Sequence, residues 1–363
     1  MRYLFFLVHP SKYYVFRHTI NQLLENGHHV DTVITSKDVL EELIKNEGWN
    51  YKNIFPEGRK IKALPTYIGA ALNTLRTIWR MECYLRKYKR YDLFITDDLL
   101  VVNGCLRRIP SILFQDDDVT AVPESALLHF FATHILTPTV SNMGRYSHKA
   151  LRFEGYKELG SFHPDRFEPD ESVVQRFNPS MEKYSIIRLV SLKSTHDVGK
   201  SGLSNDDVLR VLAMLQSIGN VYISSERALP EQFEKYRIQI IPNDMPHALY
   251  HAQLLIADSQ TMCAEAAILG TPFVRFNDFV GRISYLDELE NKYGLGFGIK
   301  PRNKQDLFDT INYLITTENL KQEWAEKRDR MISDKIDLTR FMYDLFSRYP
   351  DSLVNNPKTK RGV

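Results

Sequence analysis

The chain has 363 residues, of which 43% are hydrophobic and 25% charged, a composition typical of folded globular proteins. This excludes a disordered tail, a collagen-like fibre and a disulfide scaffold, and the length predicts two domains. Because 47 basic residues oppose 45 acidic ones, the net charge is only +2. No overall charge favours nucleic acid, so we expect no nucleic-acid partner.

The cysteines and the apolar runs indicate the cellular compartment in which we expect the protein. Cys83, Cys105 and Cys263 are far apart and lack metal-ligand spacing, which is typical of reduced thiols. The apolar run at the start is short and no small-residue cleavage site follows it, so we expect a strand there and not a signal peptide. No apolar run approaches the roughly 18 residues of a membrane-spanning helix. We expect a cytoplasmic protein without a metal site.

Short apolar runs alternate with segments of helical period along the first half of the chain. Strands are predicted at 4–8, 30–35, 91–96, 111–114 and 132–137, and helices at 18–26 and 39–45. Gly27 fits the position after the first helix, where a left-handed backbone is common. Strands that alternate with helices indicate βαβ units and a mainly parallel sheet.

A polar, proline-containing stretch at 162–170 interrupts this pattern, and a second α/β series follows it. Its predicted strands are 186–192, 221–224, 238–241, 254–257 and 272–276, and its predicted helices are 206–218, 246–251, 261–269, 304–317 and 320–333. We therefore predict domains at 1–165 and 166–335, with a cleft between them. Ligands of such sheets bind beyond the carboxyl ends of the strands.

The most informative segment spans residues 254–272. A buried strand ends in Asp258-Ser259 and a helix starts at once, so free backbone N–H groups and the positive end of the helix dipole favour a phosphate. Glu265 lies nearly two turns along that helix, where a carboxylate suits the hydroxyls of a ribose. The alternative is an ordinary N-cap followed by a solvated glutamate. The spacing alone leaves both open.

The pattern Asp-Ser-x5-Glu-Ala-x2-Leu-Gly-x-Pro at 258–272 resembles the nucleotide-sugar signature of GT-B-fold enzymes, specifically the non-hydrolysing UDP-N-acetylglucosamine 2-epimerases. The chain is more similar still to an uncharacterised prokaryotic family related to them and often associated with surface-polysaccharide genes. The resemblance covers most of the chain and includes segments 155–164, 199–204, 223–226, 249–252 and 279–282. It implies an α/β, GT-B-like fold of two doubly wound Rossmann-like domains, with 336–363 forming a helix that returns to the first domain and a tail.

The resemblance also implies roles for individual residues. Ser259 would contact the donor phosphate and Glu265 the ribose, while Lys193 and His196 would face the diphosphate. A surface-loop histidine is the alternative for His196. The remaining implied donor-binding residues are Ser224, Glu226 and Asp258. The expected substrate is a nucleotide-sugar, UDP-linked, with no separate cofactor.

Three positions depart from the epimerase pattern. Ala264 stands where epimerases have a second glutamate, so that contact is missing. Gln260 and Thr261 replace two glycines, which makes the loop less permissive for a close approach of the backbone. These departures argue against strict epimerase chemistry.

Acidic residues follow two predicted strands of the first half, as Asp97-Asp98 and as Asp116-Asp117-Asp118. Carboxylates that lie close together raise one another's pKa, which suits proton transfer. Epimerases place acids at comparable strand ends to move a proton beside the anomeric carbon, and a transferase needs one base to deprotonate an acceptor hydroxyl. The alternatives are aspartates that cap the following helices and the Asp-x-Asp metal site of GT-A transferases, which the two-domain pattern disfavours.

Three functional hypotheses follow. The leading one is a glycosyltransferase of surface-polysaccharide or glycolipid assembly, with His9 or Asp117 as base and a glycan or lipid-linked acceptor. His9 follows the first predicted strand, and loop packing is its alternative. The second hypothesis is a nucleotide-sugar 2-epimerase in which Asp97, Asp117 and His196 move protons. The third is a non-catalytic protein that binds a nucleotide-sugar.

Residues 66–90 form a predicted amphipathic helix with six basic residues and one acid, interleaved with aromatic and aliphatic side chains. Such helices lie on anionic membrane surfaces, so peripheral membrane contact is one interpretation of this segment. The alternative is a helix packed on the core with a solvated basic face. Nucleic acid fits less well, because no binding motif accompanies the patch.

Overall fold

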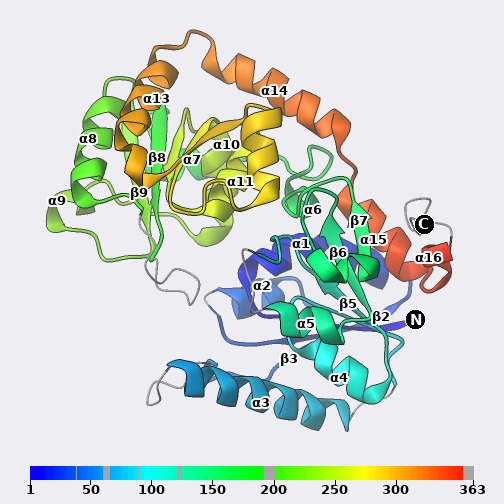
Figure 1. The fold of residues 1–363 in the computed structure, drawn as a ribbon. Coiled ribbons are helices and arrows are strands. Elements are labelled where there is room, and N and C mark those ends of the chain that lie inside the picture. The colour runs from blue at the N-terminus through cyan, green and yellow to red at the C-terminus, as the bar shows by residue number, and fades with distance from the viewer. Residues whose placement is uncertain (38, 60–65, 88–89, 121–124, 192–201, 355–363) are drawn as a thin grey trace. The chain divides into compact units, whose positions relative to one another are not determined.

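The computed structural model describes residues 1–363 except 38, 60–65, 88–89, 121–124, 192–201 and 355–363. The chain forms two compact units, unit 1 (Met1–Ser161 with Ile336–Val363) and unit 2 (Phe162–Lys335). Each unit has a parallel sheet with helices packed against it (Figure 1). Within the described part of the chain, no helix is long and apolar enough to cross a membrane.

Unit 1 has a seven-stranded sheet with the order β3-β2-β1-β4-β5-β6-β7. Its strands are β1 (Arg2–Leu7), β2 (His29–Ile34), β3 (Tyr51–Asn53), β4 (Leu93–Thr96), β5 (Ser111–Phe114), β6 (His134–Pro138) and β7 (Ala150–Phe153). Its helices are α1 (Pro10–Glu25), α2 (Leu40–Asn46), α3 (Thr66–Leu85), α4 (Leu100–Arg107), α5 (Ala126–Phe131), α15 (Leu338–Ser347) and α16 (Asp351–Val354). α6 (Leu159–Phe162) lies where unit 1 ends.

Aromatic packing joins the two ends of the chain within unit 1. The Phe5 ring of β1 contacts Phe16 of α1 and Phe346 of α15, at centroid distances of 5.5 and 6.2 Å. The Tyr3 hydroxyl donates a hydrogen bond to the Phe346 carbonyl at 2.9 Å, and the Ile336 N–H donates one to the Glu154 carbonyl at 2.8 Å. The last helices therefore belong to the core of the first unit.

Unit 2 has a five-stranded parallel sheet with the order β12-β11-β10-β8-β9. Its strands are β8 (Tyr184–Leu189), β9 (Asn220–Ser225), β10 (Leu255–Ala257), β11 (Phe273–Phe276) and β12 (Gly296–Ile299). Its helices are α7 (Glu171–Phe177), α8 (Asn205–Leu215), α9 (Glu231–Glu234), α10 (Met245–His251), α11 (Gln260–Leu269), α12 (Ser284–Asp287), α13 (Lys304–Thr316) and α14 (Leu320–Asp334).

The strand orders confirm the predicted doubly wound α/β architecture. Unit 1 begins with the order 3-2-1-4-5-6, and unit 2, counted from its own first strand, has the order 2-1-3-4-5. In both orders the chain winds in one direction from its first strand and then in the other. This reversal opens a crevice at the carboxyl ends of two adjacent strands, β1 and β4 in unit 1 and β8 and β10 in unit 2.

Some predicted elements were wrong in extent or in kind. The first helix begins at Pro10 and not at residue 18, because the Nδ1 atom of His9 accepts a hydrogen bond from the Ser11 N–H at 3.1 Å and caps the helix. Residues 238–241 form no strand, and Arg237 makes only an isolated bridge to Ile223. The short strands β3, β7 and β12 were not predicted.

Candidate functional site

In unit 2, β10 leads directly into α11 at the crevice beside β8. Ser259 has an extended backbone, and its hydroxyl accepts a hydrogen bond from the Met262 N–H at 3.3 Å, which makes it the N-cap of α11. Gly270 ends the helix in the left-handed conformation, with φ of 79°. A ten-residue helix thus presents its positive dipole end at the carboxyl edge of the sheet, as the sequence predicts.

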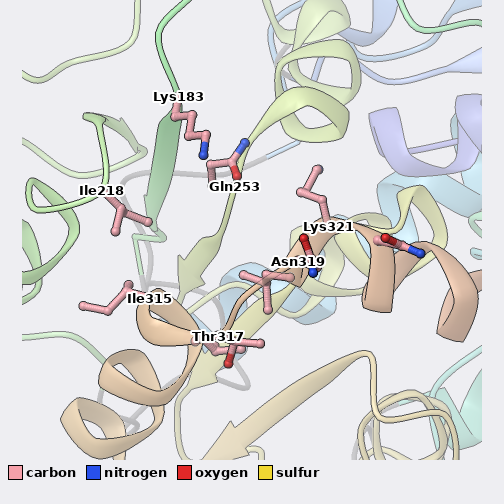
Figure 2. Close-up of a pocket in the computed structure, with 10 residues that line it drawn as sticks. Lys183, Ile218, Gln253, Ile315, Thr317, Asn319 and Lys321 are labelled. Atoms are coloured by element: carbon pink, nitrogen blue, oxygen red, sulfur yellow. The ribbon is translucent and has the colours of Figure 1, made fainter.

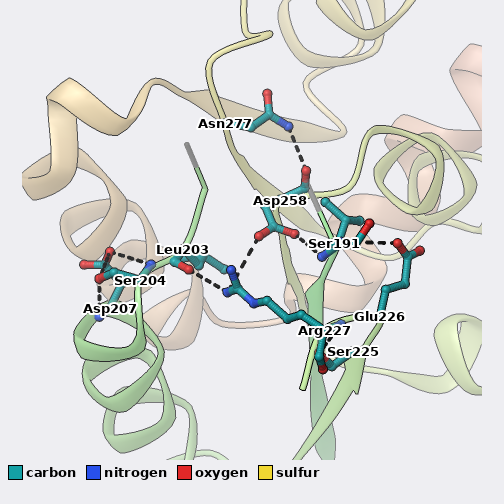
Figure 3. Close-up of polar contacts among 10 residues, drawn as sticks. Ser191, Leu203, Ser204, Asp207, Ser225, Glu226, Arg227, Asp258 and Asn277 are labelled. Carbon is teal, nitrogen blue, oxygen red and sulfur yellow. Dashed lines mark hydrogen bonds and ion pairs between the residues drawn. The ribbon is translucent and has the colours of Figure 1, made fainter. Parts of the chain in front are cut away.

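Asp258, which precedes Ser259, is buried and held by the protein itself (Figure 3). Its Oδ1 accepts a hydrogen bond from the Val190 N–H at 2.7 Å, and its carbonyl accepts one from the Asn277 side chain at 3.0 Å. Burial raises the pKa of Asp258 to about 6, although the Val190 N–H and the nearby Arg227 favour the charged form. Asp258 therefore joins the ends of β8 and β10 and positions the loop between β10 and α11.

Gly202 approaches Asp258 closely from the loop before α8. A Cβ atom at this position would lie 2.7 Å from Oδ2 of Asp258, so any larger residue would displace the carboxylate. The Arg227 guanidinium lies 3.9 Å from the same oxygen and donates a hydrogen bond to the Leu203 carbonyl at 2.6 Å. These contacts hold residues 202–203 next to Asp258 at the crevice.

Ser224 and Glu226, two of the predicted donor-binding residues, lie at the end of β9 and are both bound by Arg188. The Arg188 guanidinium donates a hydrogen bond to the Ser224 hydroxyl at 2.7 Å and forms an ion pair with Glu226. Glu226 also accepts a hydrogen bond from the Ser191 N–H at 3.3 Å. The Nε atom of Arg188 is buried and makes no hydrogen bond to any described residue.

Glu265 lies on the open face of α11. Seven of the ten helix residues are buried, whereas Thr261 and Glu265, one turn apart, remain partly exposed. This face is accessible to a ligand that reaches the helix N-terminus. Lys193 and His196, predicted to face a diphosphate, lie outside the described residues.

In unit 1, charged side chains gather at the carboxyl ends of β4 and β5. Asp116, just after β5, is buried and forms ion pairs with Lys12 of α1, at 3.0 Å, and with Lys157. Burial alone would raise the pKa of Asp116, but these two ammonium groups hold it well below its usual range. Asp116 therefore stays ionised.

The pKa values of Asp97 and Asp117 are shifted in the opposite direction. Burial raises the pKa of Asp97 to about 7, against the attraction of Lys12, and raises that of Asp117 to about 6, with a further contribution from the Asp116 carboxylate. The Oδ1 atom of Asp97 is shielded from solvent and makes no hydrogen bond to any described residue. Lys12 is thus the electrostatic neighbour of all three carboxyl groups.

The other two aspartates of these runs support the local backbone. Asp98 accepts a hydrogen bond from the Leu99 N–H at 2.5 Å and pairs with Arg59 at 2.7 Å. Asp118 is buried and accepts a hydrogen bond from the Asn142 N–H at 2.7 Å. The turn-forming interpretation therefore fits Asp98 and Asp118, whereas Asp97, Asp116 and Asp117 face the lysines.

Glu158 adds a fourth carboxyl group to this cluster. It is buried beside Lys157, whose ammonium nitrogen lies 3.4 Å from Oε1, and burial raises its pKa. His9, by contrast, is exposed and caps α1. Among the described residues, no group of three or more His, Cys, Asp or Glu side chains is arranged to hold a metal ion.

Four basic residues of these sites were not among the predicted site residues. Lys12 and Lys157 hold Asp116 from positions 104 and 41 residues away, and Arg188 and Arg227 organise the edge of unit 2. A partial signal existed for two of them. Arg188 interrupts an otherwise buried strand, and Lys157 belongs to the segment 155–164 that carries the family resemblance.

A cavity of about 560 Å³ lies elsewhere in unit 2 (Figure 2). Its lining includes Lys183 and Gln253, just before β8 and β10, together with residues around the start of α14 such as Lys321. These positions mark the amino ends of the strands, so the cavity lies at the edge of the sheet away from Ser259. The Lys321 ammonium group is already bound to the carbonyls of Tyr250 and Ala252, at 2.9 and 2.8 Å.

Comparison with known proteins defines the fold. No protein-family model matches the sequence, and no curated protein matches it. Solved structures match over nearly the whole chain. A S. aureus protein, MnaA, in a co-structure with UDP has a TM-score of 0.66 at 11% identity, over 98% of this chain and 99% of that chain.

Two further structures represent two enzyme classes. A UDP-GlcNAc 2-epimerase from Neisseria meningitidis bound to UDP-GlcNAc has a TM-score of 0.59 at 12% identity, over 98% of this chain and 100% of that one. A spinosyn rhamnosyltransferase, SpnG, complexed with thymidine diphosphate has a TM-score of 0.59 at 15% identity, over 95% and 100%. The chain thus has the GT-B-like fold that such glycosyltransferases and UDP-GlcNAc 2-epimerases share.

Proposed function

We propose that this protein is a glycosyltransferase that uses a nucleotide-sugar donor, UDP-linked, in the assembly of a surface polysaccharide or glycolipid. Unit 2 binds the donor. The N-terminus of α11 and the Ser259 hydroxyl contact its phosphates, and Glu265 on the open face of the same helix binds the ribose. By the family resemblance, Lys193 and His196 assist at the diphosphate. The reaction needs no separate cofactor.

The observation that carries the transferase assignment is the state of Asp97. A carboxyl group with a pKa of about 7 and a buried oxygen that makes no hydrogen bond within the described part of the chain is poised to act as a general base. Asp97 accepts the proton of an acceptor hydroxyl while the acceptor oxygen attacks the anomeric carbon. The nucleoside diphosphate leaves with the electron pair of the broken glycosyl bond.

Donor binding and transfer are tested in two stages. First, a panel of nucleotide-sugars is screened by thermal shift, since a ligand that binds only the folded state raises the melting temperature. A UDP-sugar that stabilises the protein supports donor binding, and a panel without any effect contradicts it. Second, release of nucleoside diphosphate is measured with glycan and lipid-linked acceptors. Release that depends on an acceptor supports transfer, and binding without any turnover favours the non-catalytic alternative.

A 2-epimerase is the second candidate, because Asp117 also has a raised pKa, about 6. Epimerisation next to the anomeric carbon needs proton transfer on both faces of the sugar, which two titratable carboxyl groups would supply. Incubation with UDP-GlcNAc and no acceptor separates the candidates. A product of the N-acetylmannosamine type would identify an epimerase, whereas unchanged UDP-GlcNAc argues against one, and the acceptor-dependent assay then decides between transferase and non-catalytic binding.

A further inference from the structure

Helix α3 has one face packed on unit 1 and one apolar face in solvent. Its inner side chains, among them Thr77 and Met81, are buried. On the outer face, four large apolar side chains are 39% to 66% exposed: Ile68, Leu72, Leu75 and Trp79. Their spacing of four, three and four residues aligns them along one side of the helix. We call these four residues the α3 stripe.

The arginines of α3 do not lie in this stripe. Arg76 and Arg80 both form ion pairs with Glu57, at 3.1 and 2.6 Å, and their guanidinium groups lie over the Phe55 ring at 5.3 and 4.3 Å. Arg80 also donates a hydrogen bond to the Ile54 carbonyl at 2.6 Å. These two arginines, which stay partly exposed, thus attach the helix to the loop after β3. The side chains of the α3 stripe are more exposed than they are.

Exposed positive charge, only partly balanced by Glu82, is found at the C-terminal end of the stripe. Arg86, seven residues after Trp79 and so on the same side, is exposed together with Lys87. Glu82, the single acid of α3, lies 2.6 Å from Arg107 of α4, and 3.7 Å from Arg86. The α3 stripe thus ends in cations, and the one carboxylate of the helix is already paired.

Helix α4 extends this surface. Its last residues carry Leu106, which is exposed, and Arg108, which is exposed in a left-handed conformation after the helix. Figure 1 shows α3 as the outermost helix of unit 1, with α4 and α5 on its inner side. The outer face of α3 is therefore accessible along its length within unit 1.

We propose that the α3 stripe docks unit 1 onto an anionic lipid bilayer. The four apolar side chains enter the boundary between headgroups and acyl chains, where the amphipathic ring of Trp79 is favoured. The cations Arg86, Lys87 and Arg108 contact acidic headgroups. This inference goes beyond the proposed reaction, because it concerns where the protein works and needs no donor or acceptor.

Charge complementarity selects a bilayer over a second copy of the chain. A symmetric contact between two α3 stripes would pair apolar side chains but would offer no acidic partner from α3 to Arg86 and Lys87, since Glu82 is bound to Arg107. An acidic membrane surface supplies that negative charge over the whole face. An anionic bilayer therefore complements both the apolar side chains of the α3 stripe and the cations at its end.

The test is co-sedimentation of the full chain with vesicles, without any sugar or acceptor. One set contains phosphatidylcholine alone and the other contains equal parts of phosphatidylcholine and phosphatidylglycerol. We expect binding to the acidic vesicles at low salt, much weaker binding to the neutral ones, and weakening as salt is raised. Absence of sedimentation with acidic vesicles at low salt would overturn the proposal.

Paired variants identify the surface. Leu75→Glu with Trp79→Glu should abolish vesicle binding, while the matched control, Leu209→Glu with Tyr313→Glu on exposed positions of unit 2, should bind like wild type. All four side chains are exposed, and unchanged melting temperatures will confirm folding. If the Leu75/Trp79 variant still binds like wild type, the stripe is not the docking surface.

Charge variants and the oligomeric state complete the test. Arg86→Gln with Lys87→Gln should weaken binding to acidic vesicles by about fivefold for each cation removed, and should reduce the salt dependence. Sedimentation velocity without lipid measures whether two copies of the chain associate. A dimer that the Leu75/Trp79 variant dissociates, without vesicle binding by the wild type, would assign the stripe to self-association and overturn the proposal. These outcomes are independent of whether the protein transfers sugar.

Discussion

At the carboxyl edge of the unit 1 sheet, carboxyl groups are brought together around two lysines, and their pKa values diverge. Asp116 is held ionised, while Asp97 and Asp117 titrate near neutrality. At the corresponding edge of unit 2, burial also raises the pKa of Asp258 to about 6, but Asp258 and Glu226 are each held by a backbone N–H group and lie near an arginine, next to the N-terminus of α11. The same topology thus gives one edge suited to moving protons and another suited to holding an anion.

Asp97→Asn is the strongest test of this difference between the two edges, because it removes the base proposed in unit 1. Since a positioned base contributes about 10²–10⁴-fold, turnover should fall by that factor while nucleotide affinity stays unchanged. Asp98→Asn is the matched control, because Asp98 pairs with Arg59 and accepts a hydrogen bond from the Leu99 N–H. Steady-state release of nucleoside diphosphate measures the effect. Near-normal turnover in the Asp97 variant would remove unit 1 from the chemistry proposed for it.

In unit 2, by contrast, loss of a buried acid should cost stability. Glu290 pairs with Arg275, which is fully buried, at 2.7 Å. Glu290→Ala removes both hydrogen bonds of that guanidinium to a carboxylate and leaves it only the weaker ion pair with Asp287, at 3.8 Å, so the free energy of unfolding should fall by about 3 kcal/mol. Denaturant unfolding measures it, and Glu234→Ala, at an exposed pair with Arg237, should leave the midpoint unchanged. Equal effects of the two variants would contradict a structural role for the buried pair.

Glu265→Ala tests whether the edge of unit 2 binds the donor. Loss of a charged hydrogen-bond acceptor for the ribose should raise the Kd of the nucleotide by about 10-fold or more, measured by calorimetry. The melting temperature without nucleotide should stay closer to that of the wild type than for Glu290→Ala, because Glu265 is partly exposed whereas Glu290 is buried. Glu231→Ala, on α9, is the control. Unchanged affinity would show that the ribose assignment is wrong.

The smallest expected effect is on pH dependence. Asp97 has a raised pKa, so below pH of about 7 it is protonated and the rate should fall. The same shift affects stability. Between the unfolded pKa near 4 and the folded value of about 7, the native state binds more protons, so the contribution of Asp97 to stability decreases as pH rises. Asp97→Asn should therefore melt higher than wild type at pH about 8, and a lower melting temperature would contradict the shift.

How much of the fold the sequence predicts depends on the length of each apolar run. The central strands β1, β4 and β5 stand out, because they are buried throughout or nearly so. β3, with the sequence Tyr-Lys-Asn, and β12, with the sequence Gly-Phe-Gly-Ile, lie at sheet edges and lack such a run. The start of α1 was missed for a related reason, since its cap is a histidine, outside the residues usually found there.

In the candidate sites, too, features set by neighbouring residues could be predicted and long-range contacts could not. The place of Ser259 at the start of a helix could be predicted because the strand–helix junction is local in the sequence, whereas the ligand contacts of Ser259 and Glu265 stay predictions. Lys12 and Lys157 could not be predicted, since their contacts to Asp116 span 104 and 41 residues and depend on how the strands are ordered in the sheet. The amphipathic character of α3 was predicted from its basic and apolar residues, but the ion pairs of Arg76 and Arg80 with Glu57 could not be, because they join the helix to the loop after β3.

The discontinuity of unit 1 has a consequence for how the protein is made. Unit 2 is one uninterrupted stretch, Phe162–Lys335, whereas unit 1 needs α15, whose Thr339 hydroxyl donates a hydrogen bond to the Gly160 carbonyl at 2.9 Å. During synthesis the residues of unit 2 all leave the ribosome before α15 does. The first half of the chain must therefore wait, incomplete, until α15 has been synthesised, and loss of α15 would damage unit 1 although most of its residues precede unit 2.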